Sequence, residues 1–151
     1  MIATKDNEIL LVEDDSNDAE LIMRAFRKGK LATRVVHLRD GAEVMDYVAN
    51  ARGGRGMARL PKVIVLDLKL PKLNGLEVLQ RLKSDALTKD VPVVMLTSSQ
   101  EECDIAKAYA LGANSYITKP IEFDAFSKTV TDMGSYWLRL NRTKRKNEGD
   151  M

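Results

Sequence analysis

One stretch of the chain, residues 62–75, constrains the fold more than any other. It contains four consecutive apolar residues at 63–66, most of them β-branched. This pattern is typical of a strand that is buried on both faces of a parallel sheet. An acid, Asp67, follows the run directly. Because open α/β folds bind their ligands at the carboxyl ends of the strands, we expect Asp67 to lie at the binding edge of such a sheet.

Further apolar runs repeat this arrangement along the chain. They cover residues 8–12, 34–38, 92–96 and 115–118. Stretches with the apolar spacing of helices separate them, at 15–29, 40–50, 75–84, 101–111 and from 122 to about 140. The alternation predicts right-handed β-α-β units, and therefore an α/β fold in which helices cover a five-stranded parallel sheet.

Polar side chains follow four of the five strands. They are Glu13, Asp14, Asp67, Thr97 and Lys119, and all are expected at one edge of the sheet. Three carboxylates gathered there repel one another by roughly 4 kcal/mol per pair, at about 4 Å and an effective dielectric constant of 20. A cation is therefore required. Oxygen ligands without His or Cys favour a hard ion, and Mg²⁺ fits best.

The same set of side chains predicts a reaction. A carboxylate beside Mg²⁺, a lysine and a hydroxyl is a suitable nucleophile toward a phosphoryl group. The cation, Lys119 and Thr97 would neutralise the charge of the resulting acyl phosphate. The residues thus predict phosphoryl acceptance on Asp67.

Composition narrows the class of protein. A chain of 151 residues with 44% hydrophobic and 30% charged residues is typical of one soluble domain. A net charge of +2 does not favour DNA as a partner, and no apolar run approaches the length of a membrane helix. A single cysteine, Cys103, and the lack of an apolar signal region predict a cytoplasmic location.

Four motifs carry a resemblance to a known family. LLVEDD, VIVLDLKLPKLNG, VVMLTSS and SYITKP occur in that order, and with them the chain closely resembles the receiver domain of two-component response regulators. The resemblance covers residues 7–140 and leaves 141–151 as a polar tail that is expected to be disordered. It implies the doubly wound, flavodoxin-like fold with strand order 2-1-3-4-5.

The resemblance also implies roles for the residues that follow the strands. Asp67 would be the phosphoacceptor. Asp14, Asp67 and the backbone carbonyl of Lys69 would bind Mg²⁺, with Glu13 acting mainly through a water. Two residues depart from the common pattern: Glu13 stands where many members have Asp, and Lys69 places a cation two residues after the acceptor.

Three further residues would read the phosphate. By the same resemblance, Lys119 would hold a phosphoryl oxygen, Thr97 would move toward the phosphate, and Tyr116 would change rotamer behind it. A chain of this kind accepts a phosphoryl group and catalyses only its own phosphorylation and dephosphorylation, so it is not expected to be an enzyme in the usual sense.

Other classes of protein fit the residues less well. A haloacid-dehalogenase-type phosphatase also uses an aspartate nucleophile, but it needs a second acid where this chain has Lys69. A flavodoxin-like cofactor binder needs a phosphate loop after the first strand, where Glu13 and Asp14 would repel a phosphate. A receiver fold that serves only as an adaptor remains an alternative, against which the intact set of site residues argues.

The expected output is through protein contacts or onward phosphotransfer, because no output domain follows the receiver in this sequence. The expected phosphodonor is a sensor histidine kinase. The long loop before the third strand and the ending Ser-Tyr-Trp-Leu resemble single-domain regulators that partner bacterial phytochromes, which makes a bacteriophytochrome a candidate kinase.

The last helix predicts self-association. Its apolar residues have heptad-like spacing, and those near its end extend past what one small domain covers. They are Met133, Tyr136, Trp137, Leu138 and Leu140. We expect them to form a homodimer interface with the fourth helix, the fifth strand and the fifth helix, as the resemblance also implies.

Overall fold

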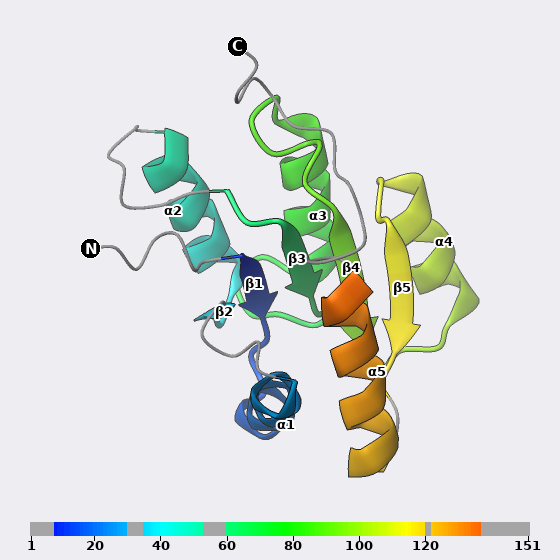
Figure 1. Ribbon diagram of the computed structural model, residues 1–151. Helices are drawn as coiled ribbons and strands as arrows, with labels where there is room; N and C mark the ends of the chain where they lie inside the picture. Colours follow the sequence, from blue (N-terminus) through cyan, green and yellow to red (C-terminus); the bar gives the residue numbers. More distant parts are fainter. Residues whose placement is uncertain (1–7, 30–34, 53–59, 120–121, 137–151) are drawn as a thin grey trace.

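The computed structural model describes residues 8–29, 35–52, 60–119 and 122–136. Within these ranges, strands and helices alternate along the chain (Figure 1). The elements are β1 (Ile9–Val12), α1 (Ser16–Lys28), β2 (Val35–Leu38), α2 (Gly41–Arg52), β3 (Val63–Leu66), α3 (Gly75–Ser84), β4 (Val93–Thr97), α4 (Glu102–Ala110), β5 (Ser115–Thr118) and α5 (Phe123–Ser135).

The strands form one parallel sheet in the order β2-β1-β3-β4-β5, which confirms the predicted fold. The bounds of β3, α3 and β5 are those predicted from the sequence, whereas β4 begins and ends one residue later. Its last residue, Thr97, pairs with Thr118 of β5, so the backbone ladder extends to the hydroxyl that was expected just beyond the strand.

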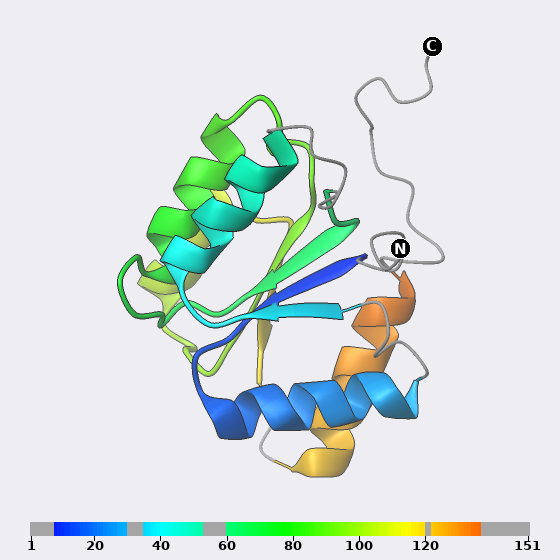
Figure 2. The ribbon, with the colours of Figure 1, turned by 90° about the vertical axis from the view of Figure 1, so that its left-hand side faces the viewer.

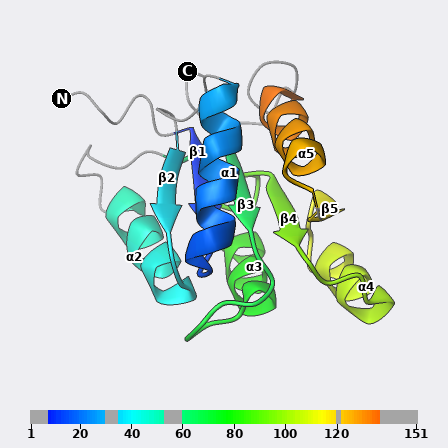
Figure 3. The same cartoon turned by 90° about the horizontal axis from the view of Figure 1, so that it is seen from below.

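Alternate residues of each central strand enter two separate hydrophobic cores. In β1, Leu10 and Val12 face the core under α2, α3 and α4, whereas Ile9 and Leu11 face the core under α1 and α5. Figures 2 and 3 show the two layers of helices on opposite faces of the sheet. Because β1, β3 and β4 are buried throughout, their sequences are continuous apolar runs instead of alternating ones.

Helices α1 and α5 pack against each other on their face of the sheet. Phe26 of α1 and Val130 and Met133 of α5 belong to the same buried cluster. The prediction that Met133 extends past the domain into a dimer interface is wrong, since only 7% of this residue is exposed. In the described part of the chain, no helix is long and apolar enough to cross a membrane.

The loop after β3 is held tightly against the start of α3. Asn74 caps α3 by accepting a hydrogen bond from the backbone N–H of Glu77, and the Glu77 side chain accepts one from the N–H of Asn74. The next residue, Gly75, donates its N–H to the carbonyl of Leu68 at 2.8 Å. A Cβ at position 75 would collide with the carbonyl oxygen of Asp67 and lie 2.7 Å from the Cα of Leu68.

We therefore expect Gly75→Ala to disturb the segment that carries Asp67. The methyl group meets backbone atoms that cannot move without shifting the loop, so the free energy of unfolding should fall by about 1–3 kcal/mol. Urea denaturation measures this loss, and Gln80→Ala, at an exposed position of the same helix, is the control. Wild-type stability in Gly75→Ala would contradict the close packing of this loop.

Candidate functional site

Backbone hydrogen bonds between neighbouring strands align the strand ends at one edge of the sheet. The N–H of Asp67 donates to the carbonyl of Val12 at 3.1 Å, and the N–H of Lys119 donates to the carbonyl of Thr97 at 2.9 Å. On the other side of β1, the N–H of Glu13 donates to Leu38 at 3.0 Å. Each polar residue is thus placed by the strand ladder that it continues.

The ammonium group of Lys119 lies at the centre of the site and contacts three carboxylates. Its Nζ is 2.8 Å from Oε1 of Glu13, 2.9 Å from Oδ2 of Asp18 and 3.0 Å from Oδ2 of Asp67. Glu13, Asp67 and Lys119 were predicted to meet here. Asp18 was not, because its position in the first turn of α1 is fully explained by the preference of helix starts for acids.

Burial and the neighbouring charges shift the pKa values of Glu13 and Lys119 in this cluster. Burial, with a further contribution from the charge of Asp67, raises the pKa of Glu13 from 4.5 to about 7, although the hydrogen bond from Lys119 acts in the opposite direction. Burial alone would lower the pKa of Lys119, but its bonds to Glu13 and Asp18 and the charge of Asp67 raise that pKa above its ordinary value. The lysine is therefore a permanent cation.

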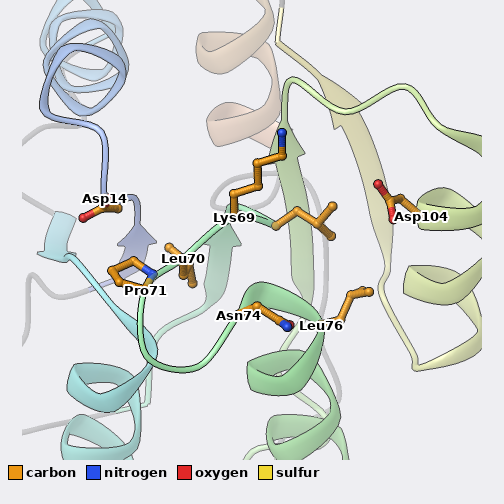
Figure 4. A pocket seen from close by; sticks show the side chains of 8 residues that line it. Asp14, Lys69, Leu70, Pro71, Asn74, Leu76 and Asp104 are labelled. Carbon is orange, nitrogen blue, oxygen red and sulfur yellow. The ribbon is translucent and has the colours of Figure 1, made fainter.

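Asp14 and Lys69 lie apart from this cluster. Both side chains line an open pocket of about 450 Å³ beside the loop after β3, together with Leu70, Pro71 and Asn74. Figure 4 shows the Asp14 side chain directed away from Lys69. Lys69 contacts the cluster through its backbone, since its N–H approaches Oδ1 of Asp67 at 3.4 Å.

The ligand atoms at this edge are of the type that a hard divalent cation prefers, but their side chains are not grouped around a common point in this structure. Glu13, Asp14 and Asp67 supply only oxygen ligands at one edge of the sheet, as Mg²⁺ and Mn²⁺ prefer. In the described residues, however, no three acidic, histidine or cysteine side chains are grouped closely enough to hold a metal ion. Asp14 is exposed, and the ammonium of Lys119 lies between Glu13 and Asp67.

Thr97 and Tyr116 converge on the loop after β4. Thr97 is fully buried, and its Oγ1 accepts a weak hydrogen bond from the N–H of Ser99 at 3.4 Å. The phenol of Tyr116 donates to the carbonyl of Ser99 at 3.0 Å. The hydroxyl of Ser99 donates to Asp104 of α4 at 2.7 Å. One loop residue thus connects β4, α4 and β5.

The predicted dimer residues are only partly within the described chain. Tyr136, which caps the end of α5, is 47% exposed. Trp137, Leu138 and Leu140 lie outside the described residues, as does the tail at 141–151.

We expect Glu13→Gln to flatten the pH dependence of stability. The folded protein holds a proton on Glu13 more tightly than the unfolded chain does, so this proton favours folding below the ordinary pKa of 4.5, and the contribution is lost as the pH rises to about 7. The Glu13 contribution to the free energy of unfolding should fall over this interval by about 3 kcal/mol at most.

Urea denaturation in EDTA over this pH interval measures the effect. Glu20→Gln is the control, because Glu20 is an exposed acid that pairs with Arg27 away from the site. The control should retain the wild-type slope. An equal slope in Glu13→Gln would show that Glu13 does not resist ionisation in the folded protein.

Comparison with known proteins agrees with this geometry. Residues 9–131 match the family model of the response regulator receiver domain. The chain is 42% identical over 135 residues to "Probable methanogenesis regulatory protein FilR2" of Methanothrix harundinacea, covering 89% of this chain and 86% of that protein. It is 36% identical to response regulator Rcp1 of Synechocystis, covering 86% of this chain and 88% of Rcp1.

Solved structures give the same result. The phosphorylated cyanobacterial phytochrome response regulator RcpA superposes with a TM-score of 0.83 at 37% identity, covering 92% of this chain and 99% of that structure. Relatives of this kind have also been solved with a divalent metal, as in the Mn²⁺-bound form of Rcp1. The chain therefore belongs to the response regulator receiver domain family and resembles the phytochrome response regulators.

Proposed function

We propose that this chain accepts a phosphoryl group on Asp67 from a histidine kinase. The position of Asp67 is the observation that supports this most directly. It follows the central strand β3, and one of its oxygens lies 3.0 Å from a buried ammonium group that can stabilise added negative charge. RcpA, which has a similar structure, has been solved in its phosphorylated form, and this gives further support.

The side chains around Asp67 suggest how transfer would proceed. A carboxylate oxygen of Asp67 attacks the phosphorus atom of the donor, the bond from phosphorus to the donor nitrogen breaks, and its electron pair stays on the imidazole. Lys119 neutralises charge on the transferred group. A divalent cation, proposed as Mg²⁺ and held by Asp14, Asp67 and the carbonyl of Lys69 with Glu13 behind a water, would neutralise the remainder.

We further propose that the loop after β4 reports the phosphate to the surface. Thr97 would turn its hydroxyl toward the phosphoryl group, which changes the bond that it makes to the N–H of Ser99. Tyr116 would follow, because its phenol is bonded to the carbonyl of the same residue. The change would reach α4 through the bond between Ser99 and Asp104.

The class of kinase is supported by the names of similar proteins. RcpA and several other similar structures are described as phytochrome or bacteriophytochrome response regulators, so a bacteriophytochrome is one proposed donor. FilR2, of comparable similarity, is named for methanogenesis regulation instead. A phosphotransfer profile against the histidine kinases of the same organism decides between a light-sensing and another sensory kinase.

Asp67→Asn should abolish Mg²⁺-dependent phosphorylation by acetyl phosphate or by a phosphorylated kinase. The amide lacks the nucleophilic oxygen but keeps the shape of the side chain. Intact-mass spectrometry measures the label, and Asp85→Asn, an acid at the end of α3 away from this edge, is the control. Stoichiometric label on Asp67→Asn would exclude Asp67 as the acceptor.

Labelling combined with amide NMR separates acceptance of the phosphoryl group from the conformational change that it causes. Thr97→Ala should retain label on Asp67 but lose the phosphate-dependent amide NMR shifts in α4 and β5, because this hydroxyl reads the phosphate instead of accepting it. Wild-type shifts in Thr97→Ala would contradict the proposed route through Ser99.

We also propose that two copies of the chain pair about a two-fold axis through α4, β5 and α5, together with the segment after α5. The support in the described residues is the weak burial of this face. Ala108 is the buried residue of α4, Tyr109 beside it is 49% exposed, and all of β5 is only half-buried. Apolar residues continue in the sequence after α5, with Trp137 as the largest.

Trp137→Ala should therefore convert a dimer to a monomer at micromolar concentration, as should truncation after Gly134. Removing a large interface aromatic usually costs most of the affinity of a small interface. Light scattering measures the mass, with Glu122→Ala, an exposed position at the start of α5, as the control. A monomeric wild-type protein, or a dimeric Trp137→Ala, would refute the proposed interface.

A further inference from the structure

We infer that Asp18, one of three carboxylates bonded to Lys119, is the one that is exchanged for the phosphoryl group when Asp67 is phosphorylated. Asp18 would then be a positioning residue that acts through Lys119, and its release would carry the phosphorylation signal to the first turn of α1. The inference rests on the proposed function of Asp67, and it gives the site a second connection to the protein surface in addition to the loop after β4.

The first step of the argument is the bonding capacity of Lys119. An ammonium group has three N–H donors and no acceptor. In the present structure all three are directed to carboxylates, at 2.8, 2.9 and 3.0 Å. A phosphoryl oxygen can therefore gain a full hydrogen bond from Lys119 only if one carboxylate gives up its own.

The second step is the cost of releasing each carboxylate. The side chain of Glu13 is 2% exposed, so its release from Lys119 would leave a buried carboxyl group that bulk water cannot reach, which is unfavourable. Asp67 carries the incoming group and stays beside the lysine. Asp18 is 38% exposed, and water can replace the lysine as its partner. Asp18 is therefore the carboxylate that leaves at the lowest cost.

The third step concerns what Asp18 is attached to. Its backbone N–H donates to Oδ1 of Asp15, the residue that caps α1, so Asp18 belongs to the capped first turn of this helix. Lys119 immediately follows β5. Their ion pair thus joins the end of β5 to the start of α1. The remainder of α1 is anchored by Ile22, Ala25 and Phe26 in the core, so release of Asp18 affects the first turn and leaves the helix packed.

Beryllofluoride, which mimics a phosphoryl group on a carboxylate, provides an equilibrium test in the presence of Mg²⁺. Asp18→Asn removes the competing charge and keeps the side-chain shape. The half-saturating beryllofluoride concentration, followed by amide NMR, should fall about fivefold, the effect of one partly exposed ion pair. Asp124→Asn removes the same charge from the exposed first turn of α5 and should bind as the wild type does.

A double-mutant cycle distinguishes exchange at Lys119 from simple charge repulsion. In a Lys119→Ala background, Asp18→Asn should change the half-saturating concentration by less than about twofold, because the bond for which Asp18 competes is gone. An undiminished effect there would show that Asp18 merely repels the ligand, and it would overturn the inference. So would an unchanged affinity in the single variant Asp18→Asn.

A second readout does not depend on the stability of Lys119→Ala. In the wild type, the amide signals of residues 16–20 should move on addition of beryllofluoride. In unliganded Asp18→Asn they should already lie toward the bound positions, whereas a silent first turn in the wild type would refute the exchange. Failure of the proposed function itself is recognised separately, because wild-type protein and Asp67→Asn would then respond to beryllofluoride alike.

Discussion

The contact of one ammonium group with three carboxylates is the interaction on which the site depends. Glu13, Asp67 and Lys119 directly follow β1, β3 and β5, and Asp18 lies in the first turn of α1. Without this cation, the burial of Glu13 beside Asp67 would be strongly unfavourable. The same cation is the group that a transferred phosphoryl would meet, so the interaction that makes the unphosphorylated cluster tolerable is also the one that phosphorylation rearranges.

The fold was largely predictable because its determinants are local. Strands buried on both faces require continuous apolar runs, and their alternation with helical spacing fixes a parallel sheet. The capping residues Asn74 and Glu77 mark the start of α3 at the predicted residue. Small errors remained where the end of a strand depends on its pairing with the next strand. Thr97 belongs to β4 because it pairs with Thr118 of β5.

The site residues that directly follow strands were predictable, because the ends of parallel strands meet at one edge of the sheet. Glu13, Asp67 and Lys119 meet as expected, whereas Asp18 contacts a lysine that is 101 residues away in sequence, and no local pattern indicates this. The outward direction of Asp14 depends on a side-chain conformation that sequence does not encode. Met133 was misassigned because the spacing of a core-facing stripe and that of a dimer seam are the same, and only the packing of α5 against α1 distinguishes them.

The bond from Tyr116 to the carbonyl of Ser99 has a consequence for how such proteins diverge. Its acceptor is a main-chain atom, which every amino acid supplies. The tyrosine therefore senses the position of the loop without depending on which side chain the loop carries. A substitution in this loop can therefore change the surface that a partner meets and still leave the bond to Tyr116 in place.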